Sequence, residues 1–268
     1  EPFDLRDRRD VLARLTPGDL RYSVFAPGGG EAIDVALKTA RHATGRRRIV
    51  SLRSGYHGHT GLALAAGDEH AAQFFLSDGP ADEFLHVPFA DLDAMAAALA
   101  GGDVAAVIAE TIPATSGFPL PPPGYLAEVK ALCERHGTVY VADEVQTGLG
   151  RTGPLWAIEA HGVDPDVLVT GKGLSGGIYP IAAAVLSERV AGWLHEDGWA
   201  HISSFGGAEV GCRVARAVLD ITTRESTRAN VDRLAGRFAA GLEDVRRRHP
   251  EWLVEVRQAG LVIGLRFA

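Results

Sequence analysis

Short apolar segments typical of buried strands alternate along this chain with segments whose apolar residues recur at helical spacing. This alternation predicts an α/β domain of three layers, with helices on both faces of a mostly parallel sheet. Strands are expected at residues 21–26, 49–52, 104–109, 139–145, 167–170 and 181–186, and helices at residues 31–42, 92–99 and 125–136. The last two strands are joined by a loop too short for a helical crossover. We therefore expect that pair to be antiparallel and the sheet to be mixed.

The C-terminal part of the chain has a different pattern. An amphipathic helix is expected over roughly residues 229–248, and two further strands, at residues 252–256 and 261–267, resemble the opening of another domain. We expect a large cofactor-binding domain in residues 1–224, and a connecting helix with the beginning of a small α+β domain in residues 225–268. Because the sequence starts almost inside a helix and stops inside a strand pattern, both ends are expected to be cuts in a longer protein.

Composition limits the kinds of protein this chain can be. It has 268 residues and a net charge of −7, and such an acidic chain is a poor candidate for binding nucleic acid. Its two cysteines, Cys133 and Cys212, match no metal-ligand spacing and fit free thiols in a reducing compartment. No apolar stretch is long enough for a membrane span, and we expect no signal peptide. The expected location is the cytoplasm, with neither a nucleic-acid nor a membrane partner.

One lysine and one aspartate stand at the ends of predicted strands. Lys172 follows the strand 167–170 and lies between Gly171 and Gly173, where an amine can be approached closely and partly desolvated. Asp143 ends another strand, and such a carboxylate is a usual partner of a cationic cofactor nitrogen. A Schiff-base lysine and an aspartate that holds a pyridinium together indicate pyridoxal phosphate (PLP). The alternatives are a solvated surface lysine and a helix-capping or ion-paired carboxylate.

Neighbouring residues extend this site. Side-chain alternation places Val145 on the same face as Asp143, where it would pack against a cofactor ring, and points Glu144 the other way, into a structural role. Residues 28–30 are three glycines between a strand and a helix, and the backbone N–H groups of such a turn suit a phosphate. Plain connections use the same turns, so the glycines alone are weak evidence. Because ligands of open α/β sheets bind beyond the carboxyl ends of strands, these loops are expected to converge.

Other kinds of site match parts of the sequence. Residues 171–176 fit G-x-G-x-x-G, but a strand-like segment follows, whereas a dinucleotide fingerprint must open a helix. A Walker motif fails because neither Ser nor Thr follows the lysine. His57 and His59, with His201 as a third ligand, could bind a metal, but histidine pairs in loops are more often hydrogen-bonding residues. We therefore expect no metal.

With these loops identified, the sequence resembles the class III aminotransferases, which are fold type I PLP enzymes of the ornithine, 4-aminobutyrate and ω-amino acid group. The likeness covers nearly the whole chain in the right order, and its motifs are jointly highly specific. They are Asp143-Glu-Val-Gln-Thr-Gly-Leu-Gly-Arg-Thr-Gly153, Asp164-Pro-Asp166, Lys172 with Gly176-Gly177 and Pro180, and the loop Tyr56-His57-Gly58.

The resemblance implies a role for each residue of the site. Lys172 would form the Schiff base and act as general base and acid for the 1,3-proton shift, and Asp143 would pair with the pyridinium nitrogen. The other implied cofactor contacts are Tyr56 and Val145 on the two ring faces, Gln146 at the ring hydroxyl, Gly29 and Gly30 at the phosphate, His57 in the aromatic loop, Glu110 close to the cofactor, and Ser204. Ser204 matches a threonine that reaches the phosphate of a neighbouring subunit, so a homodimer with shared active sites is implied.

The chain also departs from the family. The family usually has Ser or Thr at the position of Gly30, so an expected hydroxyl is absent and phosphate binding would rest more on the backbone and Ser204. Ala208 and Glu209 stand where the family usually has Asn and Pro. Thr115 stands where ornithine and 4-aminobutyrate members have a glutamate, which argues against those two substrate types.

The function expected from the sequence is transfer of an amino group between an amine or amino acid and a 2-oxo acid, through a Lys172 Schiff base. Another PLP reaction on the same scaffold, that of an aminomutase, decarboxylase, racemase or lyase, would use the same lysine and aspartate. A non-catalytic remnant of such an enzyme is a third reading. The sequence leaves these alternatives, and the donor and acceptor, open.

Overall fold

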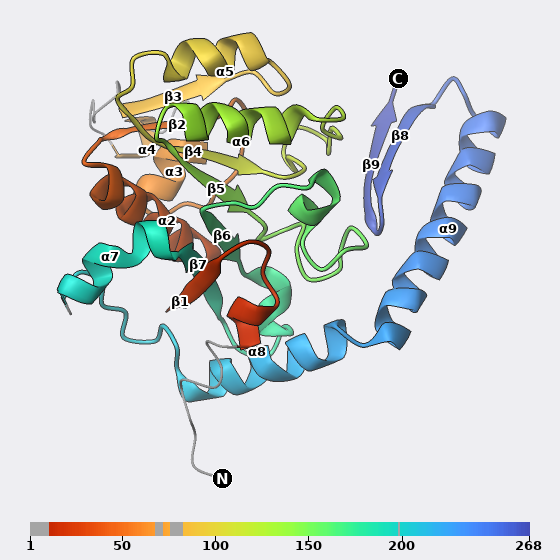
Figure 1. Cartoon of the computed structure of the whole chain (residues 1–268). Helices are drawn as coiled ribbons and strands as arrows, with labels where there is room; N and C mark the ends of the chain where they lie inside the picture. The colour runs from red at the N-terminus through yellow and green to blue at the C-terminus, as the bar shows by residue number, and fades with distance from the viewer. Residues whose placement is uncertain (1–10, 68–71, 76–82, 198) are drawn as a thin grey trace.

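The computed structural model describes residues 11–67, 72–75, 83–197 and 199–268 (Figure 1). These residues form a seven-stranded sheet in the order β1-β7-β6-β5-β4-β2-β3 and a separate hairpin, β8-β9. The large sheet consists of β1 (Leu20–Ala26), β2 (Arg48–Leu52), β3 (Phe84–Val87), β4 (Val104–Glu110), β5 (Val139–Asp143), β6 (Val167–Thr170) and β7 (Ala182–Ser187). β7 pairs antiparallel with β1 and β6, and the other pairs are parallel. The mixed, mostly parallel sheet expected from the sequence is confirmed.

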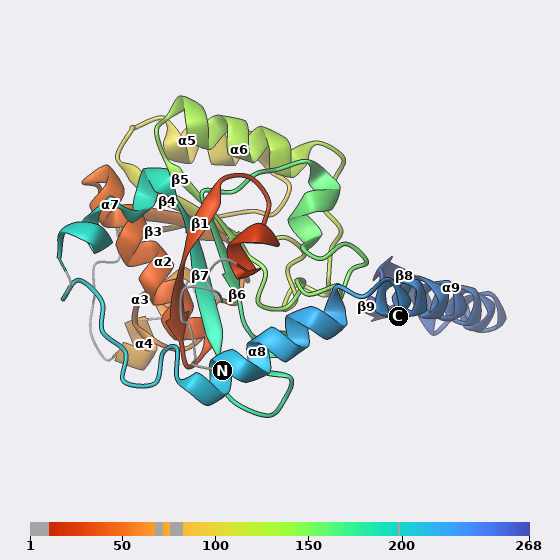
Figure 2. The same cartoon turned by 60° about the horizontal axis from the view of Figure 1, so that its bottom comes forward.

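Helices cover both faces of the sheet and give the predicted three layers (Figures 1 and 2). One face carries α2 (Gly29–Thr44), α3 (Gly61–Gly67) and α7 (Glu188–Glu196), and the other carries α5 (Leu92–Leu99), α6 (Tyr125–Arg135) and α8 (Glu209–Thr222). Every residue of β4 is buried, because a parallel strand in the middle of such a sheet meets a helix layer on each side. No helix within the described ranges is long and apolar enough to cross a membrane.

The C-terminal elements lie to one side of this body (Figure 1). They are α9 (Glu225–Arg248), β8 (Leu253–Ala259) and β9 (Val262–Phe267). The predicted helix and both strands are present, and α9 begins four residues earlier than expected. Its apolar side packs loosely here, since Phe238 remains 49% exposed and no residue of α9 is buried among those described. The hairpin touches the body through Leu261, whose N–H donates to the carbonyl of Arg151 at 2.9 Å.

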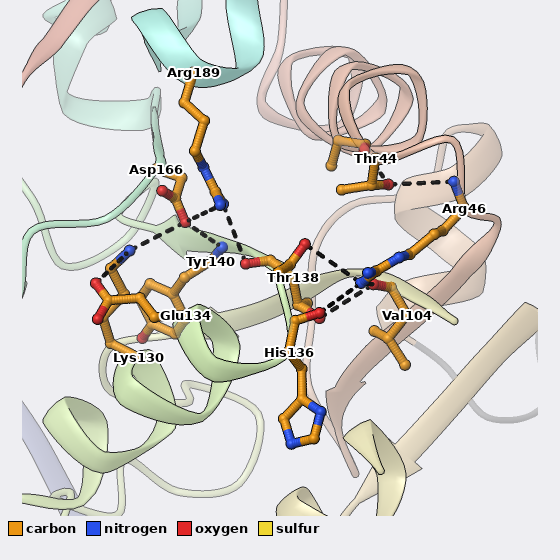
Figure 3. A network of polar contacts seen from close by, with 12 residues as sticks. Thr44, Arg46, Val104, Lys130, Glu134, His136, Thr138, Tyr140, Asp166 and Arg189 are labelled. Atoms are coloured by element: carbon orange, nitrogen blue, oxygen red, sulfur yellow. Dashed lines mark hydrogen bonds and ion pairs between the residues drawn. The ribbon is translucent and has the colours of Figure 1, made fainter. Parts of the chain in front are cut away.

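A polar network ties the amino ends of the central strands together (Figure 3). The Asp166 carboxylate, just before β6, accepts hydrogen bonds from Tyr140 N at 2.8 Å and Lys130 Nζ at 3.2 Å. Arg189, at the start of α7, forms an ion pair with the same oxygen at 3.1 Å. Nearby, Arg46 donates to the carbonyl of His136 at 2.8 Å. This edge of the sheet is therefore fixed by a largely buried carboxylate and its cations, opposite the edge where Asp143 and Lys172 stand.

Replacing Asp166 with asparagine should lower the free energy of unfolding by about 2–3 kcal/mol, because two cations lose their buried counter-charge. Asp164, two residues earlier, is exposed and makes a matched control, for which Asp164→Asn should change stability by no more than about 0.5 kcal/mol. Urea unfolding of the three proteins measures both values. Equal effects of the two substitutions would show that the network adds nothing.

Candidate active site

The predicted site residues gather at the carboxyl ends of the parallel strands. Glu110 on β4 pairs in register with Asp143 on β5, which in turn pairs with Val169 on β6, three residues before Lys172. They border a cavity of about 180 Å³, which is lined by Gly29, Gly30, Tyr56, His57, Gly58, Glu110, Asp143, Val145, Gln146 and Lys172. The structure thus brings together every residue of the predicted site except Ser204, and it adds Gly58.

Asp143 is held rigidly at the floor of this cavity. Its Oδ2 lies 2.7 Å from His57 Nδ1, and its Oδ1 accepts the N–H of Val145 at 3.0 Å. The side chains of His57 and Asp143 are 1% and 4% exposed. Because an ionised carboxylate can only accept, His57 donates from Nδ1. Its buried Nε2 has no hydrogen-bond partner among the described residues.

Glu110 fixes the loop that follows β2. Its two carboxylate oxygens accept the backbone N–H groups of Tyr56 at 2.9 Å and Ala114 at 3.1 Å. Burial raises the pKa of Glu110, and the negative charge of Asp143 raises it further, while His57 and these two hydrogen bonds lower it. Glu110 therefore positions Tyr56 at the cavity and holds a proton more readily than an exposed glutamate does.

This raised pKa gives folding a pH dependence of definite sign. The folded protein keeps the Glu110 proton at pH values where the unfolded chain has released it. The contribution of this proton to the free energy of unfolding is therefore complete below the ordinary glutamate pKa. The contribution is lost as pH rises through the raised pKa. Glu110→Gln cannot titrate, so its free energy of unfolding relative to wild type should increase with pH across this window. Urea unfolding over a pH series measures the difference, and a constant difference would contradict the assignment.

Glu144 points away from the cavity as predicted, although β5 ends at Asp143, two residues before the end of the predicted strand, and Glu144 and Val145 lie in the segment that follows it. Its carboxylate is buried and accepts four hydrogen bonds, from the hydroxyls of Thr111 and Thr147 and from the N–H groups of Ala157 and Ile158. Burial raises its pKa, and the four donors lower it. Glu144 therefore anchors the segment after β5 to the body of the sheet.

Lys172 begins a short 3₁₀ turn, Lys172–Ser175, in a left-handed conformation with φ of 38°. A non-glycine residue in this region carries backbone strain of about 1–3 kcal/mol. Space is tight at the preceding Gly171, where a Cβ would lie 3.3 Å from Ala182 Cβ and 3.4 Å from Val145 Cγ1. The sequence favoured a partly desolvated amine, whereas Lys172 is exposed in the structure.

The N-terminus of α2 faces the cavity with free donors. The first backbone bond of the helix runs from Ala32 N to Gly28 O at 3.1 Å, which leaves the N–H groups of residues 29–31 without a helical acceptor. Gly28 stands at the cap position, and no side chain in the described parts of the chain caps this end. Free N–H groups and the positive end of the helix dipole suit an anion.

Ser204 and two of the histidines lie apart from these groups. Ser204 is exposed on the loop between α7 and α8, outside the cavity. His59 contacts the ring of Tyr56, with centroids 5.6 Å apart, and His201 Nδ1 lies 3.3 Å from Lys38 Nζ. The three histidines of a hypothetical metal site thus have different neighbours, and the described residues contain no cluster suited to a metal ion.

Comparison with known proteins agrees with this geometry. The sequence profile described as aminotransferase class-III matches residues 3–268. The chain belongs to the class III aminotransferases. An uncharacterized aminotransferase of Archaeoglobus fulgidus is 49% identical over 257 residues, which are 96% of this chain and 60% of that protein. The solved ornithine aminotransferase of Toxoplasma gondii ME49 is 28% identical with a TM-score of 0.90, and the match covers 100% of this chain and 65% of that one.

A second class III relative was solved with ligands. The taurine:2-oxoglutarate aminotransferase of Bifidobacterium kashiwanohense, in complex with PLP and glutamate, is 27% identical with a TM-score of 0.89. The match covers 100% of this chain and 65% of that one. The chain therefore spans less than two thirds of the length of these relatives.

The cavity fits the cofactor of the class III aminotransferases. PLP presents a basic ring nitrogen, a phosphate and an aldehyde, and each finds a chemically matched group here. Asp143 offers a buried carboxylate, the end of α2 offers uncapped N–H groups, and Lys172 offers a primary amine. The sequence analysis did not predict the contact between His57 and Asp143, because local residue spacing does not indicate that two residues 86 positions apart will meet.

Proposed function

We propose that this protein is a PLP-dependent aminotransferase, which moves an amino group between an amine or amino acid and a 2-oxo acid. The observation that carries the proposal is the meeting of Lys172, Asp143 and the uncapped end of α2 at one cavity. Membership of the class III family supports it independently.

When bound, PLP supplies an electron sink for the bonds at the substrate carbon. Lys172 would hold the cofactor through its amine and, once a substrate amine has displaced it, would move a proton between the substrate and cofactor carbons. The Asp143 carboxylate, which contacts His57, would keep the ring nitrogen protonated. The remaining proposed contacts are Gly29 and Gly30 at the phosphate, Tyr56 and Val145 at the ring faces, Gln146 at the ring hydroxyl, and Glu110 behind Tyr56.

Ornithine and 4-aminobutyrate are not among the amino donors that we propose. Thr115 lies where ornithine and 4-aminobutyrate members have a glutamate, and its hydroxyl instead donates to the carbonyl of Ser54 at 2.5 Å. Without a carboxylate at this position, an arginine that reads the substrate has no partner here. A donor of another kind, such as a different ω-amino acid or an amine, fits better.

We also propose a cytoplasmic homodimer with shared active sites. Large apolar side chains are exposed on the loop that carries Ser204, namely Trp199 at 81%, Ile202 at 61% and Phe205 at 66%. A partner subunit would cover them and bring its Ser204 to the phosphate.

We also propose a domain boundary at residue 224, between α8 and α9, because the elements that follow this residue make few contacts with the body.

Isotope tracing tests the proposed reaction. The protein is incubated with PLP, a panel of amino donors and a ¹³C-labelled 2-oxo acid, and mass spectrometry detects the labelled amino acid. Label in that product, dependent on both PLP and a donor, is the expected result. Consumption of a donor without labelled product would instead indicate a decarboxylase, racemase, lyase or aminomutase on the same scaffold.

A further inference from the structure

A threonine hydroxyl fills the space of the missing side chain at Gly30. A Cβ built on Gly30 would lie 2.8 Å from Thr60 Oγ1 and 3.4 Å from Thr60 Cγ2. Gly30 is the second residue of α2 and lines the cavity, so this hydroxyl lies close to the first turn of the helix. Thr60 comes from a different segment, the loop between β2 and α3, about thirty residues further along the chain.

The Thr60 hydroxyl makes no structural hydrogen bond within the described residues. A threonine directly before a helix ordinarily caps it by accepting an N–H of the first turn. Before α3, however, Asp34 of α2 takes this role, since its Oδ1 accepts the N–H of Ala63 at 2.8 Å. No hydrogen bond joins the Thr60 hydroxyl to another residue in the described ranges, and the side chain is exposed.

The backbone holds Thr60 at this place. Gly58 adopts a φ of +117°, and a Cβ there would lie 2.7 Å from Gly30 Cα, so the two glycine backbones touch. Any side chain at Gly58 would push the loop off the end of α2. This contact keeps the Thr60 hydroxyl next to the helix end without a covalent link between the two segments.

We infer that Thr60 binds the phosphate of the cofactor and supplies the hydroxyl that Gly30 lacks, an assignment that rests on the proposed PLP function. A phosphate at the end of α2 accepts N–H groups from residues 29–31 on one side. The Thr60 hydroxyl donates a further, charge-assisted hydrogen bond from the other side. Phosphate affinity in this protein thus depends on a residue outside the glycine turn.

Cofactor titration of matched variants tests this assignment. PLP and pyridoxal, which lacks the phosphate, are each titrated by absorbance into wild type, Thr60→Val, Thr60→Ser and the double variant Gly30→Ser/Thr60→Ala. Thr60→Val should raise the Kd for PLP about tenfold, the usual effect of losing a hydrogen bond to a charged group, with no change for pyridoxal. Thr60→Ser should remain near wild type. In the double variant the alanine vacates the space next to residue 30, so the hydroxyl introduced by Gly30→Ser can enter it and should restore most of the affinity.

The outcomes separate this inference from the proposed function. Wild type that prefers PLP over pyridoxal, with Thr60→Val unchanged, would overturn the Thr60 assignment alone. So would an equal loss of PLP and pyridoxal binding in Thr60→Val, because that indicates structural damage to the loop. Wild type that binds neither compound would overturn the proposed function together with the inference.

Discussion

Lys172→Ala is expected to abolish the covalent attachment of PLP and to reduce turnover by a factor on the order of 10⁴ or more. The alanine removes both the amine that bonds to the cofactor and the group that carries the proton, and proton transfer by a positioned side chain alone contributes about 10²–10⁴. Borohydride reduction followed by peptide mapping measures the attachment. Wild type should yield a reduced cofactor on the peptide that contains Lys172, and the variant should yield none.

Two controls make this result specific to the amine at the cavity. Lys172→Arg keeps the positive charge but has no primary amine, so it should lose the covalent adduct as well. Lys130→Ala removes a lysine from the opposite edge of the sheet, where its ammonium contacts Asp166 at 3.2 Å. It should lower stability but keep the adduct. A normal adduct in Lys172→Ala would show that another lysine holds the cofactor and would contradict the proposed site.

The sequence predicted the strands of the site well, for a physical reason. Buried parallel strands read as continuous apolar runs, as in β4 and β6, and the residues that follow them collect at one edge of the sheet. Once the order of such strands is recognised, the approach of Asp143 and Lys172 follows. Alternation along the predicted strand 139–145 also separates the roles of Asp143 and Glu144, although β5 itself ends at Asp143.

Other features leave weak signals in the sequence. β3 is a four-residue strand at the edge of the sheet, only partly buried, so its pattern resembles a loop. α7 begins directly after β7 with no turn residues between them, which hides the boundary. The contacts of Gly30 with Gly58 and Thr60 arise only when the β2 loop folds onto α2. Contacts between distant loops depend on tertiary packing, which local patterns do not encode.

The exposure of Lys172 and the exposed side of α9 have a related cause. Local sequence specifies which residues begin a turn or share a helix face, but the degree of burial depends on what packs against them. α9 has the predicted apolar positions, yet Val245 is 37% exposed because, among the described residues, α9 packs mainly against β8 and to a lesser extent against α8. Exposure is therefore a property of the assembled surroundings.

Asp143→Asn and Glu144→Gln should separate catalysis from stability at adjacent positions. Both replace a buried carboxylate by an amide of the same shape. Asp143→Asn removes the charge that holds a proton on the ring nitrogen, and loss of such a preorganised electrostatic contact costs about 10²–10³ in rate. Its fold should survive, since the amide oxygen can still accept from His57 or from the N–H of Val145.

Glu144→Gln should have the reverse effect. Each carboxylate oxygen of Glu144 accepts one backbone N–H, Oε1 from Ile158 and Oε2 from Ala157, so the NH₂ group of glutamine must face one of these two donors. Leaving buried donors unsatisfied should lower the free energy of unfolding by roughly 2–4 kcal/mol, while turnover at a temperature where the variant remains folded should stay close to wild type. Urea unfolding and steady-state turnover of both variants measure the two effects. An equally severe loss of activity in fully folded Glu144→Gln would show that the opposite orientation of these side chains does not separate their roles. It would contradict the assignment of Asp143 as the carboxylate that faces the cofactor.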